Sequence, residues 1–450
     1  MVAISTKRKQ LFKMKKTLQE KLAAHRFKRP SRFVWWLLAK TIIAKILAPK
    51  YNPHYKIIDD INKNKGPAFL IYNHQSRIDY VWLAQSTYPT RLNFMVGYNE
   101  FFRSHLAFIL RLLHVIPKKN FVLDPTAMQG VDTIIREKGG VVCFSPEGMS
   151  SITGHNQPVV DGTGKMFKYY GVPVYMVKMK GAFLTNTKVC LDERKGRIDA
   201  ELSLLFSPDD LKGMSDQEIE DKANEALWQD DYEWNKAEHI KYETHGNICS
   251  HLSDLCYRCP RCGKEFTMVS EKDDIHCSAC GNGAKMDDYY AFHPYDEKCI
   301  IPESPSKWTD WERSLVIDEI RANPAYEIHE HVKIGKLPKY EYVKKMGTSK
   351  LCGEGQFVIN HDGVFFSGTK DGKPFQFQLK YTEIPTTGMV LDVTYFSLYY
   401  KGEFYDIFPD DPMVWKMVLS IEEMHRLHVN KWKNFPWFSW MYEGKVLPKD

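Results

Sequence analysis

Short apolar runs alternate with polar loops through the first 200 residues. The runs at 68–72, 141–144 and 171–177 have the length and polar flanks that predict three buried strands. A polar cluster follows each of the first two runs directly. Because sites in α/β sheets lie outside the carboxyl ends of the strands, this spacing predicts an α/β domain with a site at its strand ends.

The pattern changes near residue 355. Short aromatic runs, which predict antiparallel strands, lie at 357–359, 364–366, 375–379, 390–400 and 403–408. The dipeptides between them that are typical of hairpin turns are Asp362-Gly363, Asp371-Gly372 and Lys401-Gly402. An amphipathic helix begins at Asp411-Pro412. This order of elements resembles the pleckstrin-homology or GRAM-like module, an antiparallel β-barrel capped by a helix.

Two helical signals lie between these regions. Ser215-x-x-Glu218 opens a periodic apolar run, and Thr309-x-x-Glu312 opens a helix that stops before Pro324. The first predicts a helical connector, and the second predicts a helical linker before the C-terminal module.

The heptapeptide NHQSRID at 73–79 follows the first strand. His74 and Asp79 cannot share a helix face, because five steps of about 100° separate them around the axis. They meet only if His74 lies in the turn and Asp79 in the first helical turn, with Ser76 as N-cap. An imidazole held by a carboxylate is a general base near pH 7. The alternative is a plain capping box of Ser76 and Asp79.

Three blocks occur in order: NHQSRID at 73–79, FSPEGMSS at 144–151 and GVPVYMV at 171–177. They resemble the N-H-x-x-x-x-D, F-P-E-G-T-R-S and G-V-P-V blocks of the glycerolipid acyltransferase family, in its lysophosphatidate acyltransferase branch. The resemblance implies transfer of a fatty acyl group from acyl-CoA or acyl carrier protein to a glycerolipid hydroxyl. It implies His74 as the base, Asp79 as its orienting group and no acyl-enzyme. Asn73, Glu147 and Gly148 would bind substrate.

The sequence departs from the family at the phosphate-binding positions. Met149 and Ser150 stand where the family has Thr-Arg, which removes a bidentate phosphate donor. The family's middle block, Gly then Ile-Pro and an Arg, reads LHVIPKK at 113–119. We therefore expect Lys118 or Lys119 to supply the positive charge, and we leave the acceptor headgroup open.

Two C-x-x-C-G turns lie between the acidic helical region and the C-terminal third. Cys259, Cys262, Cys277 and Cys280 predict a structural zinc ribbon, because paired thiolates at this spacing converge on one tetrahedral ion. Cys256 offers an alternative first ligand. Two disulfides or free thiols are the other interpretations; disulfides would need an oxidising compartment, to which nothing in the sequence directs the chain.

Charge is concentrated at the N-terminus. Residues 1–32 contain eleven Lys or Arg against Glu20 alone, whereas the whole chain of 450 residues carries a net charge of +6. The apolar stretch that follows, from Phe33, is about 17 residues long and interrupted by Lys40 and Lys45, short of the roughly 20 residues that span a bilayer. We expect an interfacial helix on an anionic membrane surface. A nucleic-acid tail or an ordinary core helix are the alternatives.

The sequence thus predicts an α/β acyltransferase domain, a small zinc ribbon with four cysteine ligands and a C-terminal antiparallel β-barrel capped by a helix. The expected parts are 1–49 (basic membrane-associating N-terminus), 50–206 (acyltransferase), 207–250 (helical connector), 251–300 (zinc ribbon), 301–345 (helical linker), 346–430 (PH/GRAM-like domain) and 431–450 (tail). We expect a peripheral enzyme on the cytoplasmic face of a membrane, in a reducing compartment. The competing interpretation is an inactive membrane-bound or lipid-binding scaffold. Nucleic-acid binding is disfavoured, because acidic residues balance the basic ones in the ribbon.

Overall fold

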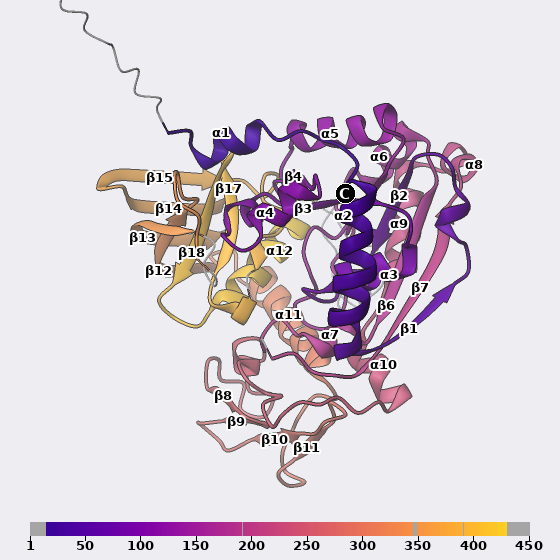
Figure 1. The fold of residues 1–450 in the computed structure, drawn as a ribbon. Helices are drawn as coiled ribbons and strands as arrows, with labels where there is room; N and C mark the ends of the chain where they lie inside the picture. The colour runs from indigo at the N-terminus through magenta and orange to yellow at the C-terminus, as the bar shows by residue number, and fades with distance from the viewer. Residues whose placement is uncertain (1–14, 191, 345–348, 390, 430–450) are drawn as a thin grey trace, which may run out of the picture.

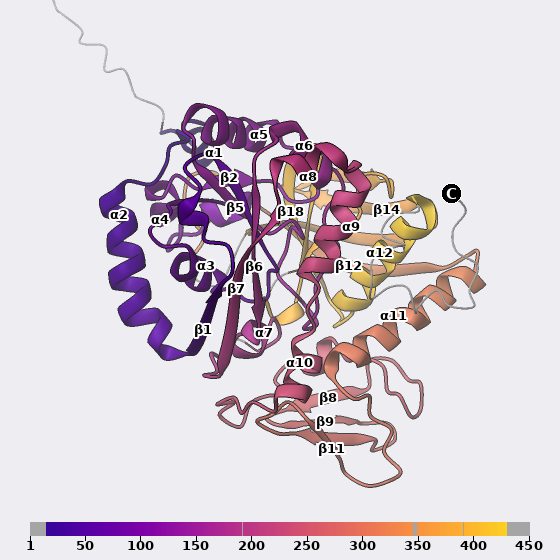
Figure 2. The same cartoon turned by 90° about the vertical axis from the view of Figure 1, so that its right-hand side faces the viewer.

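The computed structural model describes residues 15–190, 192–344, 349–389 and 391–429. The basic leader before residue 15 and the predicted tail at 431–450 lie outside these residues. The chain forms a mixed α/β part, a small pink four-stranded part and a C-terminal orange and yellow sheet, which pack against one another (Figures 1 and 2).

The α/β part is built on a seven-stranded mixed sheet. Its strands, in spatial order, are β1 (Asn52–Ile57), β7 (Arg197–Phe206), β6 (Val174–Lys180), β2 (Ala68–Tyr72), β5 (Val141–Phe144), β3 (Leu92–Gly97) and β4 (Ile116–Lys118). β2 is parallel to both β5 and β6, so the polar segments after β2 and β5 meet at one edge of the sheet. The strands predicted at 68–72 and 141–144 are confirmed, and the strand predicted at 171–177 begins later, at Val174. Every residue of β2 and β5 is buried, as continuous apolar runs require.

Helices cover both faces of this sheet. On one face lie α3 (Asp79–Thr87) and the long helix formed by α2 (Arg32–Trp36) and η1 (Leu37–Leu47), whose Trp35, Ala39 and Ile43 are buried in the same core as Trp82. On the other face lie α5 (Pro125–Asp132), α6 (Thr163–Tyr170), α8 (Pro208–Gly213) and α9 (Asp216–Leu227). The further short helices are α1 (Leu18–Ala23), α4 (Ala107–Leu112), α7 (Ala182–Thr185) and α10 (Asp231–Glu238).

The predicted connector at 207–250 needs correction. Ser215 caps α9 through a capping box with Glu218, as expected. However, Leu211 of α8 and Ile219, Ala223 and Leu227 of α9 share a buried core with strands β2 and β5. These helices therefore complete the α/β domain, because their apolar stripe is buried against the sheet rather than spanning between domains.

The small part is a four-stranded antiparallel sheet of β11 (Phe292–Pro294), β10 (Gly283–Met286), β9 (Asp274–Cys277) and β8 (Met268–Glu271). Helix α11 (Pro305–Ala322) follows it. Arg313 of α11 donates to Glu422 and Glu423 of α12 (Val414–Val429) at 2.7 and 2.8 Å, and all three side chains are buried. This ion cluster joins the linker helix to the C-terminal module.

The C-terminal sheet has seven antiparallel strands. In spatial order they are β15 (Lys373–Leu379), β14 (Gly363–Lys370), β13 (Lys350–Asn360), β12 (Glu327–Lys336), β18 (Glu403–Pro409), β17 (Phe396–Tyr400) and β16 (Gly388–Met389). The predicted antiparallel sheet with α12 packed on its core is confirmed. β17 is shorter than the run predicted at 390–400, and a short helical turn, Leu391–Val393, precedes it. Among the described residues, β15 and β16 are the two outer strands of the sheet and are not paired with each other. A closed PH/GRAM-like barrel therefore stays a prediction.

The predicted helical linker at 301–345 is wrong in part. α11 is the predicted helix, but it begins at Pro305 with Ser304 as N-cap rather than at Thr309. Residues 327–336 form β12, the strand that joins the two halves of the C-terminal sheet. Ile328, Val332 and Ile334 alternate with exposed polar residues, which is the period of a half-buried strand.

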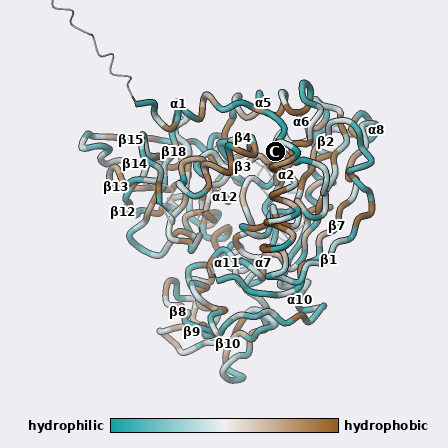
Figure 3. The backbone as a smooth tube through the Cα atoms, in the orientation of Figure 1, coloured by the Kyte–Doolittle hydropathy of each residue, from teal (hydrophilic) through white to brown (hydrophobic). Residues whose placement is uncertain are grey.

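No helix among the described residues is long and apolar enough to cross a membrane. Figure 3 shows hydrophobic segments along α2 and within the sheets.

Candidate active site

The predicted contact between His74 and Asp79 is present at the end of β2. His74 Nδ1 lies 2.8 Å from Asp79 Oδ2, and Asp79 is buried while the imidazole remains partly exposed. Within the described part of the chain, Nε2 of His74 has no hydrogen-bond partner. An imidazole held in this way keeps its proton on Nδ1 and can accept another at Nε2. Its catalytic role stays a prediction.

The turn that brings the pair together differs from the predicted one. α3 begins at Asp79 with Ile78 as its N-cap residue, so Ser76 is not the N-cap. Instead, the hydroxyl of Ser76 donates to Asp79 Oδ1 at 2.6 Å and its backbone N–H donates to the same oxygen at 3.0 Å. Asp79 therefore bonds both Ser76 and His74, so the predicted pair is present, whereas a plain capping box with Ser76 as N-cap is not.

Asn73 is fully buried and extends the sheet. Its Nδ2 donates to Met179 O, and its Oδ1 accepts from Met179 N, both at 2.7 Å. The side-chain amide thus imitates a backbone peptide paired with β6. A contact between Asn73 and substrate stays a prediction.

Glu147 organises the loop that follows β5. Its carboxylate accepts from the backbone N–H of His74 at 2.9 Å, from Gln157 N at 2.9 Å and from Asn156 Nδ2 at 3.0 Å. Burial raises the pKa of Glu147 to about 8, and the hydrogen bonds from these three residues oppose that rise. Glu147 thereby ties the turn after β2 to the turn after β5; its predicted contact with the acceptor stays a prediction.

Gly148 permits a left-handed backbone turn, and Met149 packs at the domain interface. Gly148 has φ +77°, and a Cβ there would lie 2.9 Å from the ring of Phe121, so only glycine fits without strain. Met149 is buried in the same core as α12 and the C-terminal sheet. The residue that replaces the family's Thr thus anchors the C-terminal module beside the site. A contact between Gly148 and substrate stays a prediction.

The two candidate lysines are engaged by backbone carbonyl groups. Lys118 Nζ donates to Lys119 O and to Val122 O, the latter at 2.9 Å. Lys119 Nζ donates to Gly402 O of the C-terminal module at 2.9 Å and lies near the rings of Tyr98 and Tyr399. Lys119 therefore contributes to the domain interface; the predicted phosphate contact of either lysine stays a prediction.

Sequence analysis missed a third lysine. Lys188 is 8% exposed, and its Nζ donates to Ser150 Oγ at 2.8 Å. Burial lowers the pKa of Lys188 to about 8, helped by the positive charge of Arg77 and opposed by Glu100. Ser151, the next residue, donates from its backbone to His74 O at 2.6 Å. No motif marks residue 188, which lies beyond the three blocks and reaches the site only through folding.

The four predicted zinc ligands converge. The sulfur atoms of Cys259, Cys262, Cys277 and Cys280 all lie within 4.8 Å of one another, whereas Cys256 is not part of this group. The Cys259–Cys280 and Cys262–Cys277 sulfur distances are 3.6 and 3.8 Å. Sulfur atoms about 2.3 Å from a tetrahedral zinc are separated by about 3.8 Å, so the donor set fits such an ion.

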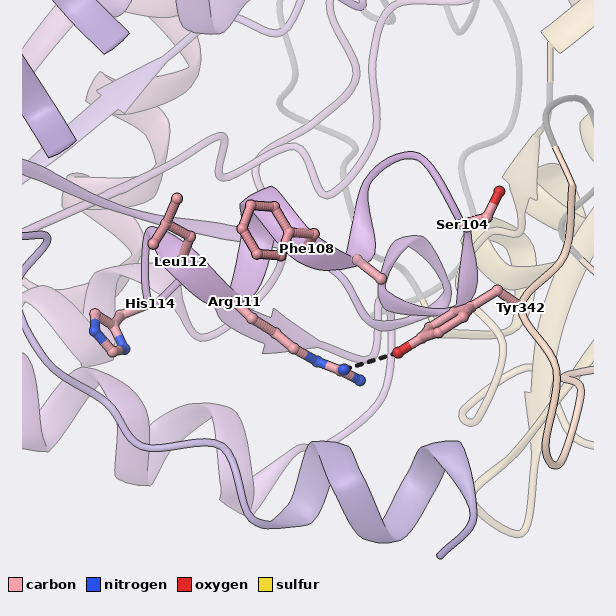
Figure 4. Close-up of a pocket in the computed structure, with 7 residues that line it drawn as sticks. Ser104, Phe108, Arg111, Leu112, His114 and Tyr342 are labelled. Carbon is pink, nitrogen blue, oxygen red and sulfur yellow. Dashed lines mark hydrogen bonds between the residues drawn. The ribbon is translucent and has the colours of Figure 1, made fainter. Parts of the chain in front are cut away.

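A separate surface cavity of about 430 Å³ lies along α4. It is lined by Ser104, Ala107, Phe108, Arg111, Leu112, His114 and Tyr342. Arg111 donates to Tyr342 Oη across one end (Figure 4). No residue of the His74 loop or of the Glu147 loop lines this cavity.

Two comparisons with known proteins find likenesses that include part of the α/β domain. Residues 53–180 match the family model described as Acyltransferase, a range that includes the His74 and Glu147 loops. Among solved structures, the chain is similar to the 1-acyl-sn-glycerophosphate (LPA) acyltransferase PlsC from Thermotoga maritima. That likeness has 16% sequence identity and a TM-score of 0.35, and covers 44% of this chain and 76% of PlsC.

Proposed function

We propose that this protein acylates a glycerolipid hydroxyl, because residues 53–180, which hold the three blocks, match the Acyltransferase family model. The donor would be a fatty acyl thioester, either acyl-CoA or acyl carrier protein. The acceptor would be 1-acyl-glycerol-3-phosphate or a related lysophospholipid.

In the proposed reaction His74 Nε2 takes the proton of the acceptor hydroxyl as its oxygen attacks the thioester carbonyl. The tetrahedral intermediate then collapses, the carbon–sulfur bond breaks, and the proton passes from His74 to the departing thiolate. Products are the ester and a free thiol, with no acyl group left on the protein. Asp79 holds the imidazole in the tautomer that this step requires, and Glu147 fixes the backbone of His74.

The observation that carries this proposal is the 2.8 Å contact of a buried Asp79 with a partly exposed His74 whose Nε2 is open. The test is release of free thiol from acyl-CoA in the presence of a panel of lysophospholipids, with detergent-solubilised protein. We expect thiol release that depends on the acceptor, and a loss on the order of 10²-fold or more in His74→Ala. Wild-type protein that releases no thiol with any acceptor would instead support the inactive lipid-binding scaffold.

We also propose that the four-cysteine cluster binds structural zinc. All four positions are thiolates, so no coordination site would remain open for a substrate or water. The ion would join the two C-x-x-C turns and stabilise the small sheet, which contacts the α/β domain. Arg194, for example, donates to Tyr290 Oη at 2.5 Å and to Asn247 O at 3.3 Å.

The proposed place of action is a membrane surface. Phe33, Trp36 and Ile46 on the α2–η1 helix are 68%, 48% and 56% exposed, and Phe108 on α4 is 76% exposed. Figures 1 and 2 place α2 and α4 on the same side of the molecule. Exposed aromatic residues beside Lys40 are what an interfacial helix on anionic lipid requires. The cytoplasmic face remains part of this proposal.

A further inference from the structure

The loop at 186–188 brings together hydrogen-bond donors that lack acidic partners. Lys188 Nζ has one hydrogen-bond acceptor in the described part of the chain, the neutral hydroxyl of Ser150, and no carboxylate oxygen within 4.0 Å. Glu100, the acidic residue that acts on it from a distance, is paired with Arg103 at 3.1 Å. Burying an ammonium without a counter-charge is costly, so this arrangement implies that an anion binds there.

Asn186 adds a second donor of the same kind. The side chain is 3% exposed, and its Oδ1 accepts from Arg77 Nε, which fixes the orientation of the amide. Its Nδ2 is then buried and, among the described residues, has no acceptor. Arg77 belongs to the same heptapeptide as His74, and burial lowers the pKa of its guanidinium while Glu193 opposes that shift. Asn186 thus bonds Arg77, whose positive charge also acts on Lys188, so two cations and an amide N–H2 group lie near one another.

Residues from three parts of the chain hold this loop in place. Lys188 O accepts from Asp392 N of the C-terminal module at 3.1 Å. From the zinc-binding part, Tyr290 Oη donates to Leu184 O at 2.5 Å. The loop also touches the site, because Ser150 and Ser151 connect Lys188 to His74. Fixed donors of this kind suit an anion, because little further ordering is needed when it binds.

Building on the proposed acyl transfer, we infer that Lys188, Asn186 and Arg77 form a phosphate-binding subsite that replaces the missing arginine at Ser150. The same chemistry would serve a phosphate of the acceptor lipid or of the acyl donor. Lys188 supplies a point charge, Asn186 a neutral donor, and Arg77, whose Nε donates to Asn186, a second positive charge. This subsite sets which phosphate-bearing substrate binds well.

The first experiment measures binding without turnover, using glycerol 3-phosphate and the full-length protein near pH 7. Lys188→Met should weaken binding by tenfold or more, whereas Lys188→Arg should retain most of it. Lys178→Met is the matched control, since Lys178 is another lysine of lowered pKa but is half-buried within β6. If Lys188→Met fails to fold, Lys188→Gln removes the charge and keeps a donor for Ser150.

The second experiment compares KM values. For an acceptor phosphate, Lys188→Met should raise KM for lysophosphatidate tenfold or more and leave KM for a monoacylglycerol unchanged. For a donor phosphate, KM should rise for acyl-CoA and not for the acyl thioester of N-acetylcysteamine. Either pattern supports the subsite.

The two proposals fail separately. If no acceptor is acylated but wild-type protein binds glycerol 3-phosphate and Lys188→Met does not, the subsite stands and acyl transfer falls. If acyl transfer proceeds while Lys188→Met changes neither binding nor any KM by more than twofold, the subsite is overturned.

Discussion

Replacing Asp79 by Asn tests whether its carboxylate orients the base or only holds the turn at Ser76. The carboxylate accepts from His74 Nδ1 at 2.8 Å on Oδ2 and from the hydroxyl and N–H of Ser76 on Oδ1. An Asn side chain keeps one oxygen, which can still accept both bonds from Ser76. Its N–H2 group then faces His74 Nδ1, which must become an acceptor. The neutral imidazole consequently carries its proton on Nε2, the atom that should receive the substrate proton.

The two effects differ in size. Loss of a correctly oriented general base costs on the order of 10² to 10⁴ in rate. The Ser76 bonds survive, so the free energy of unfolding should fall by about 1.5–3 kcal/mol, the value of one hydrogen bond to a charged group. The expected variant is therefore folded and nearly inactive.

Thiol release under saturating acceptor gives the rate, and urea unfolding gives the stability. Asp60→Asn is the control, because Asp60 caps a short helix of the same domain through Asn62 N at 2.9 Å and has no contact with His74. It should change stability slightly and activity not at all. An Asp79→Asn enzyme within fivefold of wild type would refute the base mechanism. A loss of activity that tracks a loss of folded protein would leave Asp79 as a structural residue that holds the turn at Ser76.

Three further outcomes are expected. Protein purified without added zinc should contain one zinc per chain by metal analysis, and Cys259→Ser should lose it; full retention would move the ligand set away from Cys259. Because the folded-state pKa of Glu147 is about 8 and its ordinary value is 4.5, the folded protein binds more protons between these values. The free energy of unfolding of the wild type should therefore fall as pH rises through this window, and that of the Glu147→Gln variant should fall less. If urea titrations give both proteins the same dependence of this free energy on pH, the reasoning is contradicted. Replacing Phe33 and Trp36 together by Glu should weaken co-sedimentation with phosphatidylserine vesicles, and Ile300→Glu, at another exposed apolar residue, should not. Equal loss in both variants would argue against a specific membrane face.

Local patterns determined the elements and two of the side-chain constellations. The apolar runs of β2 and β5 predict buried strands because no polar residue interrupts them, and their bounds agree with the structure. The five-residue spacing of His74 and Asp79 permits contact only across a turn, and that contact is present. The two C-x-x-C-G turns correctly predicted that four thiols converge. Ligands that are close in sequence are positioned mainly by their own turns.

Tertiary structure decided what cannot be read from neighbouring residues. Glu147 lies in a motif, yet its hydrogen bonds to His74 and Gln157 depend on β2 and β5 being adjacent in the sheet. Lys188 lies in no motif, and its ammonium reaches Ser150 because the loop after α7 folds back over the site. The physical reason is that burial and partner atoms, which set the charge and orientation of a side chain, come from residues far away in the sequence.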